Sequence, residues 1–284
     1  MDRLEAHRSF YANLITAGAG LKNHGPLTTA FASIPRERFV GPGPWRVFTL
    51  GGYIETPSAD PAFLYQDVVV GLVPERKINN GQPVLHAFCL AALNVKEGEK
   101  VIHIGAGTGY YTALLAKLTG PTGSVAAYEI EQDLARDAAR NLADFSNVAA
   151  YHRSGSEGPL PDCDAIYVSA GATAPLDIWL DALRPNGRLL LPLTPTDGPG
   201  GMPGAGGMFL ITRTSNERFD ARFVCPVMII PCAGARDDET ASKLSEAFKR
   251  GDSRNVRSLR RNAPPDETCW CSGNGWWLST SPTM

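Results

Sequence analysis

Short apolar segments alternate with helical patterns from residue 83 to residue 192 of this chain. Short continuous apolar strands separated by helices are typical of a parallel sheet that helices cover on both faces. The predicted strands span 100–104, 124–129, 148–151, 164–169 and 188–192, and the predicted helices span 83–95, 109–119, 131–143 and 175–183. The alternation therefore predicts a doubly wound α/β fold with a mostly parallel sheet.

The segment before this region has a different pattern. Amphipathic spacing predicts a helix over residues 3–17, and a second short helix is predicted at 27–34. Residues 40–80 are rich in Pro and Gly, so we expect them to be irregular, with short strands at 46–49 and 67–73.

The segment after this region begins with a Gly- and Pro-rich run at 194–207, which predicts a flexible loop. Strand-like runs at 207–214 and 221–231 predict an antiparallel closing hairpin. A tail at 237–284 carries a capped helix and the hairpin-like sequence TCWCSGNGWWLS, whose tryptophans we expect to pack rather than to recognise a substrate. The predicted parts are an N-terminal segment at 1–82, a cofactor-binding domain at 83–236 and a C-terminal extension at 237–284.

Composition argues against several kinds of partner. A formal net charge of −2 gives no bulk electrostatic basis for binding nucleic acid. No run approaches the roughly 18 apolar residues of a spanning helix, and the acidic N-terminus lacks the apolar core of a signal peptide. The cysteines lie mostly in apolar contexts, and Cys269 and Cys271 have no second Cys/His pair nearby. We therefore expect a cytoplasmic protein without a membrane segment or a metal site.

The sequence HIGAGTGYYT at 103–112 places glycines between a predicted strand and a predicted helix. Gly105, Gly107 and Gly109 follow a G-x-G-x-G pattern, whereas the dinucleotide fingerprint is G-x-G-x-x-G. Glycine lets the backbone approach a ligand closely, and the helix that follows offers free N–H groups. The tighter spacing favours the S-adenosylmethionine loop of Rossmann-like methyltransferases over a nicotinamide-dependent oxidoreductase.

An acidic residue ends the next predicted strand. From the position of Glu129, about 20 residues after the glycine loop, a carboxylate can accept hydrogen bonds from the ribose hydroxyls of a nucleoside. Glu131 is the alternative carboxylate, although its position indicates the start of the next helix. These residues predict S-adenosyl-L-methionine as the cofactor.

Several segments of the chain resemble the protein-L-isoaspartate O-methyltransferase family. They are AFASIPRERFV (30–40), GQPVLHA (81–87), VIHIGAGTGYYTALLAKL (101–118), DAIYVSAGATAPLDIWLDALRPNGRLLLPL (164–193) and RFVCPVMIIP (222–231). The resemblance implies a class I methyltransferase fold, a Rossmann-like seven-stranded sheet with an antiparallel closing strand. It also implies methyl transfer to the carboxylate of L-isoaspartyl residues in proteins or peptides, with S-adenosyl-L-homocysteine as the product.

Three positions depart from the pattern of that family. Gly81 stands where the family carries a Ser beside the accepting carboxylate, Ser156 stands where it carries an Asp near the adenine, and His103 replaces an acid before the glycine loop. A carboxylate acceptor is ionised at neutral pH and needs no base. Loss of the Ser therefore removes an orienting hydrogen bond but leaves the chemistry possible.

Nearby side chains offer substitutes for the missing Ser. Asn79 and Asn80 carry amides that both donate and accept hydrogen bonds. His86 is either a packed core histidine or, like His103, a candidate base for an amine or hydroxyl acceptor. The predicted catalytic residues are Asn79, Asn80, Gly81 and His86. The predicted cofactor-binding residues are Gln82, His103, Gly105, Ala106, Gly107, Thr108, Gly109, Tyr110, Glu129, Ser156 and Glu157.

His103 also suggests a dependence on pH. A neutral imidazole accepts a hydrogen bond from the ammonium group of the cofactor, whereas a protonated one repels it, so we expect cofactor affinity to fall below about pH 6.5. The acceptor itself stays open between a peptide, a protein and a small molecule, and a non-catalytic relative that binds cofactor or peptide is the further alternative. No motif indicates an oligomeric state.

Overall fold

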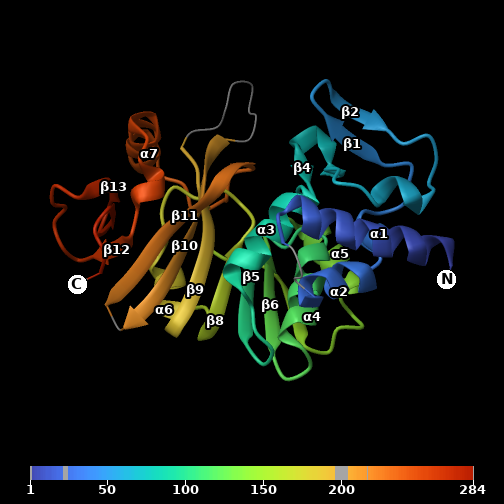
Figure 1. Cartoon of the computed structure of the whole chain (residues 1–284), viewed down its shortest axis with the longest axis horizontal. Coiled ribbons are helices and arrows are strands. Elements are labelled where there is room, and N and C mark those ends of the chain that lie inside the picture. The colour runs from blue at the N-terminus through green and yellow to red at the C-terminus, as the bar shows by residue number, and fades with distance from the viewer. Residues whose placement is uncertain (1, 22–24, 196–203, 216, 284) are drawn as a thin grey trace. The chain divides into compact units, whose positions relative to one another are not determined.

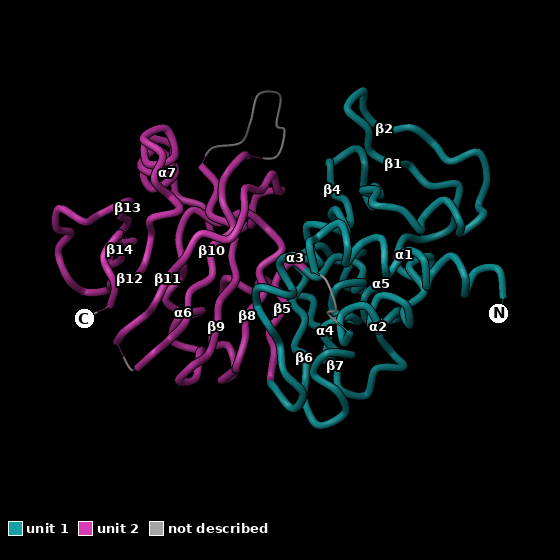
Figure 2. The backbone as a smooth tube through the Cα atoms, viewed as in Figure 1, with its two compact units in different colours: residues 1–99, 106–153 teal, residues 100–105, 154–284 magenta. Residues whose placement is uncertain are grey.

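The computed structural model describes residues 2–21, 25–195, 204–215 and 217–283. These residues form two compact units (Figure 2), one of residues 1–99 and 106–153 and the other of residues 100–105 and 154–284. The flexible loop predicted at 194–207 falls mostly on residues 196–203, which lie outside the described residues. No described helix is both long enough and apolar enough to cross a membrane.

The first unit contains the N-terminal helices, two small hairpins and part of the α/β core (Figure 1). Its α-helices are α1 (Arg3–Gly18), α2 (Gly25–Ser33), α3 (Pro83–Leu93), α4 (Tyr110–Thr119) and α5 (Gln132–Asn141). Its strands are β1 (Arg46–Thr49), β2 (Gly52–Glu55), β3 (Gly71–Val73), β4 (Ile78–Asn79), β6 (Ser124–Glu129) and β7 (Val148–His152). Its 3-10 helices are η1 (Arg36–Phe39), η2 (Pro61–Leu64) and η3 (Pro74–Arg76).

Aromatic side chains join the N-terminal helices to the rest of the first unit. α1 packs against α2 and α3, and α2 packs against α4. The ring of Tyr110, at the start of α4, lies 6.4 Å from that of Phe31 and 5.6 Å from that of Phe39, and Tyr11 lies 6.0 Å from Phe31. Burial of these rings removes a large apolar area from water, which stabilises the packing of α1 and α2. Both helices lie where the sequence predicts them.

The prediction for residues 40–80 is correct for one strand and wrong in the extent of the other. β1 matches the strand predicted at 46–49, and it pairs with β2, which the sequence did not indicate. The strand predicted at 67–73 is reduced to β3, which begins at Gly71. The buried guanidinium of Arg36 donates to the carbonyls of Leu64, Gln66 and Val68. These carbonyls are therefore occupied and do not join a strand ladder.

The second unit contains the remaining sheet and the C-terminal tail. Its strands are β5 (Lys100–Ile104), β8 (Cys163–Val168), β9 (Leu183–Leu193), β10 (Gly204–Ser215), β11 (Arg218–Ile229), β12 (Ser258–Arg261), β13 (Cys269–Gly273) and β14 (Trp276–Ser279). Its helices are α6 (Asp177–Ala182), α7 (Asp238–Arg250) and the 3-10 helix η5 (Ser253–Asn255).

The strands of the second unit form a mixed sheet in the order β13-β14-β12-β11-β10-β9-β8-β5 (Figure 1). β5, β8 and β9 run parallel, and β10 closes the parallel part because it runs antiparallel to β9. In the first unit, β6 and β7 also run parallel. β5 and β8 are buried along nearly their whole length, as expected for parallel strands covered on both faces. The predicted α/β class, with parallel strands and an antiparallel closing strand, is confirmed.

Several strands of this sheet begin earlier than predicted, among them β9 and β10. β9 starts at Leu183 rather than at 188, and Leu183 pairs with Cys163 of β8. β10 starts at Gly204 rather than at 207, and Gly204 pairs with Ile229 of β11. Backbone pairing with a neighbour extends both strands across Gly- and Pro-containing sequence that by itself is typical of loops.

The tail continues the sheet of the second unit. β12 pairs with β11, and the hairpin of β13 and β14 pairs with β12. The ring of Trp270 lies 5.5 Å from that of Phe209 and 5.1 Å from that of Phe248 on α7, and Trp276 and Trp277 are buried. The predicted capped helix, hairpin and packed tryptophans of the tail are confirmed.

Candidate active site

The glycine loop connects β5 to α4, and its backbone requires glycine. The angle φ is +76° at Gly105, +56° at Gly107 and +97° at Gly109. Gly109 is the N-cap of α4, and a Cβ atom there would lie 2.7 Å from Cδ1 of Leu142. Both the backbone angle and the lack of space therefore favour glycine at this position. The loop leads into a helix N-terminus, whose first N–H groups lack partners within the helix.

The carboxylate of Glu129 holds the glycine loop against the end of β6. Its Oε2 accepts a hydrogen bond from the N–H of Gly107 (2.7 Å) and its Oε1 accepts one from the N–H of Glu131 (2.9 Å). The N–H of Ala106 donates to the carbonyl of Tyr128 (3.1 Å). Burial raises the pKa of Glu129, and the N–H donors act against that rise. A carboxylate has about four lone-pair positions, so Glu129 keeps acceptor capacity for a ribose hydroxyl.

Glu131 has a different role from Glu129. It lies at the N-cap of α5, where the sequence predicts a helix start, and its carboxylate forms a two-bond ion pair with Arg76, with both N–O distances at 2.6 Å. The hydrogen bonds from Arg76 lower the pKa of Glu131. Arg76 belongs to η3, so this ion pair ties the segment between β3 and β4 to the strand end that carries Glu129. No sequence motif marks Arg76 for this contact.

The side chains of Thr108 and Tyr110 are used within the first unit. The hydroxyl of Thr108 donates to the carbonyl of Phe39, and the hydroxyl of Tyr110 lies 3.4 Å from that of Tyr11. Both hydroxyls therefore have partners within the protein.

The start of α3 is capped from a distant part of the chain. One oxygen of Asp67 accepts a hydrogen bond from the N–H of Val84 (2.9 Å), and the other accepts one from Nε2 of Gln82 (2.8 Å). Gln82 is exposed, although its side-chain amide is engaged with Asp67. Sequence reasoning found the helix start at Pro83 but missed Asp67, because a cap 15 residues upstream of Gln82 follows no local spacing rule.

The imidazole of His86 occupies the space beside Gly81. Gly81 has a φ of +73°, and a Cβ atom there would lie 2.1 Å from Nε2 of His86. The His86 ring stacks on Tyr111, with centroids 3.5 Å apart and planes within 7°. The hydroxyl of Tyr111 in turn donates to the carbonyl of Gly81 (3.5 Å). The structure therefore explains the glycine at position 81, because the histidine fills the volume that a side chain would need. Sequence reasoning did not identify Tyr111.

The two asparagines before Gly81 use their amides differently. Oδ1 of Asn79 accepts a hydrogen bond from the N–H of Gly81 (2.9 Å), and its Nδ2 donates to the carbonyl of Lys77 (3.2 Å). Asn80 is paired with Val70 twice, because its N–H donates to the Val70 carbonyl and its Oδ1 accepts from the Val70 N–H, both at 2.9 Å. Nδ2 of Asn80 is buried and has no hydrogen-bond partner among the described residues.

In the second unit, His103 is buried in β5. Its Nε2 lies 2.9 Å from Oγ of Ser169, and its ring stacks on Tyr167 with centroids 5.4 Å apart. Burial lowers the pKa of His103 from 6.5 to about 3. The imidazole is therefore neutral at pH 5.5, and the predicted loss of cofactor affinity through its protonation near pH 6.5 is wrong. Desolvation, which the sequence does not display, decides its charge.

Ser156 also belongs to the second unit, and its hydroxyl bonds to the protein itself. Its Oγ lies 2.6 Å from Oγ of Ser154 and donates to the carbonyl of Ala233 at 3.2 Å. A Cβ atom at Gly234 would lie 2.3 Å from this oxygen, so the turn at Gly234 closes over it. Glu157 is exposed.

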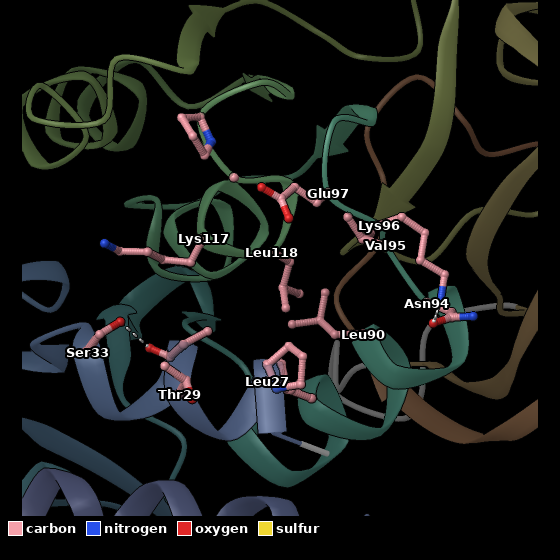
Figure 3. Close-up of a pocket in the computed structure, with 14 residues that line it drawn as sticks. Leu27, Thr29, Ser33, Leu90, Asn94, Val95, Lys96, Glu97, Lys117 and Leu118 are labelled. Carbon is pink, nitrogen blue, oxygen red and sulfur yellow. Dashed lines mark hydrogen bonds between the residues drawn. The ribbon is translucent and has the colours of Figure 1, made fainter.

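A cavity of about 850 Å³ in the first unit lies away from these residues. Figure 3 shows Leu27, Leu90 and Leu118 gathered in it, with Lys96 and Lys117 on different sides. It lies at the C-terminal end of α4, whereas the glycine loop precedes the N-terminal end of that ten-residue helix, roughly 15 Å away. None of the predicted site residues lines this cavity.

The chemistry of the first-unit residues fits a nucleoside cofactor. The loop carries glycines with positive φ angles, a side chain has no room at Gly109, and the carboxylate that fixes the loop retains acceptor capacity. Among the described residues, no group of three or more His, Cys, Asp or Glu side chains is arranged to hold a metal ion. The fold and the glycine loop define a Rossmann-like protein of the class I methyltransferase type.

Comparison with known proteins identifies the family. The family model for protein-L-isoaspartate (D-aspartate) O-methyltransferase matches residues 9–236. A protein-L-isoaspartate O-methyltransferase from Brucella anthropi is 30% identical over 207 residues, which cover 72% of this chain and 84% of that protein. One from Methylorubrum extorquens is 28% identical over 81% of this chain and 89% of that protein. The chain therefore belongs to the protein-L-isoaspartate (D-aspartate) O-methyltransferase family.

Solved structures agree with the fold. A protein-L-isoaspartate O-methyltransferase superposes with a TM-score of 0.65 at 21% identity, over 90% of this chain and 72% of that one. A Plasmodium falciparum protein assigned to the same enzymes, in complex with S-adenosyl-L-homocysteine, gives 0.62 at 20% identity, over 80% of this chain and 98% of that one. The predicted enzyme class, an S-adenosylmethionine-dependent O-methyltransferase, is confirmed by the family. The tail after residue 236 lies beyond the family match.

Proposed function

We propose that this protein transfers a methyl group from S-adenosyl-L-methionine to the carboxylate of L-isoaspartyl residues in peptides or proteins. The observation that carries the proposal is the family match over residues 9–236, which includes the glycine loop, Glu129 and the segment around Gly81. Relatives with this activity in their names align over most of their own length.

The cofactor would be held chiefly by the glycine loop and Glu129. The backbone of Gly107 and Gly109 can approach the ligand without a side chain in the way, and the Glu129 carboxylate accepts hydrogen bonds from ribose hydroxyls. Roles for Gln82, His103, Ser156 and Glu157 in holding the cofactor stay predictions.

When bound, the cofactor supplies a sulfonium methyl group that is transferred in line to an acceptor oxygen. The residues of this chain have to hold the acceptor in line and exclude water. Because a carboxylate acceptor is ionised at neutral pH, no side chain has to remove a proton from it. This agrees with a site in which Asn79, Asn80 and His86, rather than a strong base, surround Gly81.

Methyl-labelled S-adenosylmethionine tests the proposal. The protein is incubated with an isoaspartyl hexapeptide, with its aspartyl twin and with a cell extract. We expect base-labile label on the isoaspartyl peptide alone. Label confined to the extract would indicate another acceptor, and cofactor binding without any label would indicate a non-catalytic relative.

Glu129→Gln provides the matched loss-of-binding variant for this assay. The substitution replaces one carboxylate oxygen, which accepts a hydrogen bond from the N–H of Gly107 or of Glu131, with an NH₂ group that donates but cannot accept. Loss of a hydrogen bond to a charged group costs about 1.5–3 kcal/mol, so affinity for S-adenosylhomocysteine should fall by roughly tenfold to a hundredfold. Unchanged affinity would contradict the assigned role of Glu129.

We further propose that the protein acts in the cytoplasm. All six cysteines are free, as expected where thiols stay reduced. Cell fractionation followed by immunodetection tests this proposal.

A further inference from the structure

One amide nitrogen beside the glycine at position 81 is left unpaired by the described residues. Nδ2 of Asn80 is buried without a hydrogen-bond partner among the described residues, and the residue as a whole is 8% exposed. A buried donor left unpaired costs about 1–3 kcal/mol, so such groups are rare in folded proteins. An orphan donor next to a reaction site points to a ligand that accepts the hydrogen bond.

The orientation of this amide is fixed by the other half of the same side chain. Oδ1 of Asn80 accepts from the N–H of Val70, and the N–H of Asn80 donates to the carbonyl of Val70. This double contact keeps the amide from rotating, so Nδ2 is held in one direction. Asn79 differs, because its Oδ1 and Nδ2 are both used within the turn that it forms.

Asn80 lies close in the chain to more accessible residues. Gly81 is half-buried and Gln82 is exposed, so the chain reaches the surface one or two residues after Asn80. His86 fills the side-chain space of Gly81 and borders the same point of the backbone.

We propose that Asn80 is the acceptor-positioning residue of this enzyme, and that its Nδ2 donates a hydrogen bond to the carboxylate of the methyl acceptor. This inference rests on the proposed carboxyl methylation. The amide takes over the orienting contact that a side chain at position 81 cannot make, because the imidazole of His86 occupies that space. A fixed neutral donor aligns an anionic oxygen without removing its charge, which keeps it nucleophilic.

Asn80→Asp is the discriminating substitution. An aspartate keeps an oxygen that accepts from the N–H of Val70, but it replaces the Nδ2 donor with a second acceptor. Asn274→Asp is the matched control, because it makes the same chemical change at an exposed asparagine in the turn between β13 and β14. Asn80→Ala is a second variant that removes the donor without adding a charge.

Two measurements separate acceptor binding from cofactor binding. One is the affinity of the isoaspartyl hexapeptide for the protein saturated with S-adenosylhomocysteine, by calorimetric titration, and the other is kcat/KM for the same peptide. We expect Asn80→Asp and Asn80→Ala to lose roughly tenfold to a hundredfold in both, the value of a hydrogen bond to a charged group. Their affinity for S-adenosylhomocysteine, and all values for Asn274→Asp, should stay within about twofold of the wild type.

Three results would overturn the proposal. The first is wild-type peptide affinity in the Asn80 variants, and the second is an equal loss in Asn274→Asp. The third is loss of S-adenosylhomocysteine binding in both Asn80 variants, which would assign the residue a structural role. A wild-type protein that binds the cofactor but never labels the isoaspartyl peptide would instead refute the proposed function, and the two failures are thus distinguishable.

Discussion

Burial of His103 should make the folded protein sensitive to acid. In the unfolded chain this histidine takes up a proton below pH 6.5, whereas burial lowers its pKa to about 3 in the folded protein. Between these two pH values the unfolded state binds more protons than the folded state. Stability therefore falls as the pH falls, and the contribution is fully present above pH 6.5.

The magnitude at pH 5.0 follows from the unfolded pKa alone, because the folded pKa lies well below that pH. Because pH 5.0 lies 1.5 units below 6.5 and each unit is worth 1.36 kcal/mol, the free energy of unfolding falls by about 2 kcal/mol. Other groups contribute with their own signs. The raised pKa of Glu129, for example, stabilises the folded state on acidification, because the folded carboxylate takes up its proton first. A comparison with a variant that lacks only His103 removes these common contributions.

Urea unfolding at pH 7.5 and at pH 5.0, followed by circular dichroism, measures the effect. The wild type should lose about 2 kcal/mol more than His103→Asn between the two conditions. His152→Asn is the matched control, because it makes the same replacement at an exposed histidine.

Equal losses in the wild type and in His103→Asn, within about 0.5 kcal/mol, would refute this reasoning. Such a result would mean that the imidazole is protonated in the folded state, despite its contacts with Ser169 and Tyr167.

Two further substitutions test the packing around the site. Gly81→Ala should lower the free energy of unfolding by more than the roughly 1–2 kcal/mol that its left-handed backbone angle costs, because its Cβ displaces the imidazole of His86. The double variant with His86→Ala should recover part of this stability in urea unfolding. Strictly additive losses from the two substitutions would contradict the contact. Arg36→Met leaves the carbonyls of Leu64, Gln66 and Val68 without their donor and should cost at least about 3 kcal/mol in the same assay. Arg36→Met with wild-type stability would contradict that account.

The sequence predicted most of the core because its strands and helices have strong local patterns. β5 and β6 have the predicted bounds, and α3 begins at Pro83 as its first-turn proline indicates. The errors lie where distant groups act on the chain, as when Arg36 takes the carbonyls before β3, or where β8 extends β9 across a Pro-Asn-Gly sequence.

For the candidate site, the structure shows which contacts the predicted residues make within the protein. Spacing alone pointed to the glycine loop and to Glu129, and the structure joins them through the bond from the Gly107 N–H to Glu129. It also selects between two neighbouring asparagines, because only Asn80 has an unused donor. Asp67, Tyr111 and Arg76 contact predicted site residues from remote positions and carry no local signal.

The sequence by itself determined the fold class, the cofactor and the family, because glycine spacing, strand periodicity and family motifs are local properties of the chain. Only the tertiary structure decided what the departures at His103 and Gly81 mean. Burial sets the charge of the imidazole at position 103, and contact with His86 across five residues of the chain sets the space at position 81. Desolvation and steric exclusion arise from the groups that folding brings around a residue, so no pattern in the neighbouring sequence can report them.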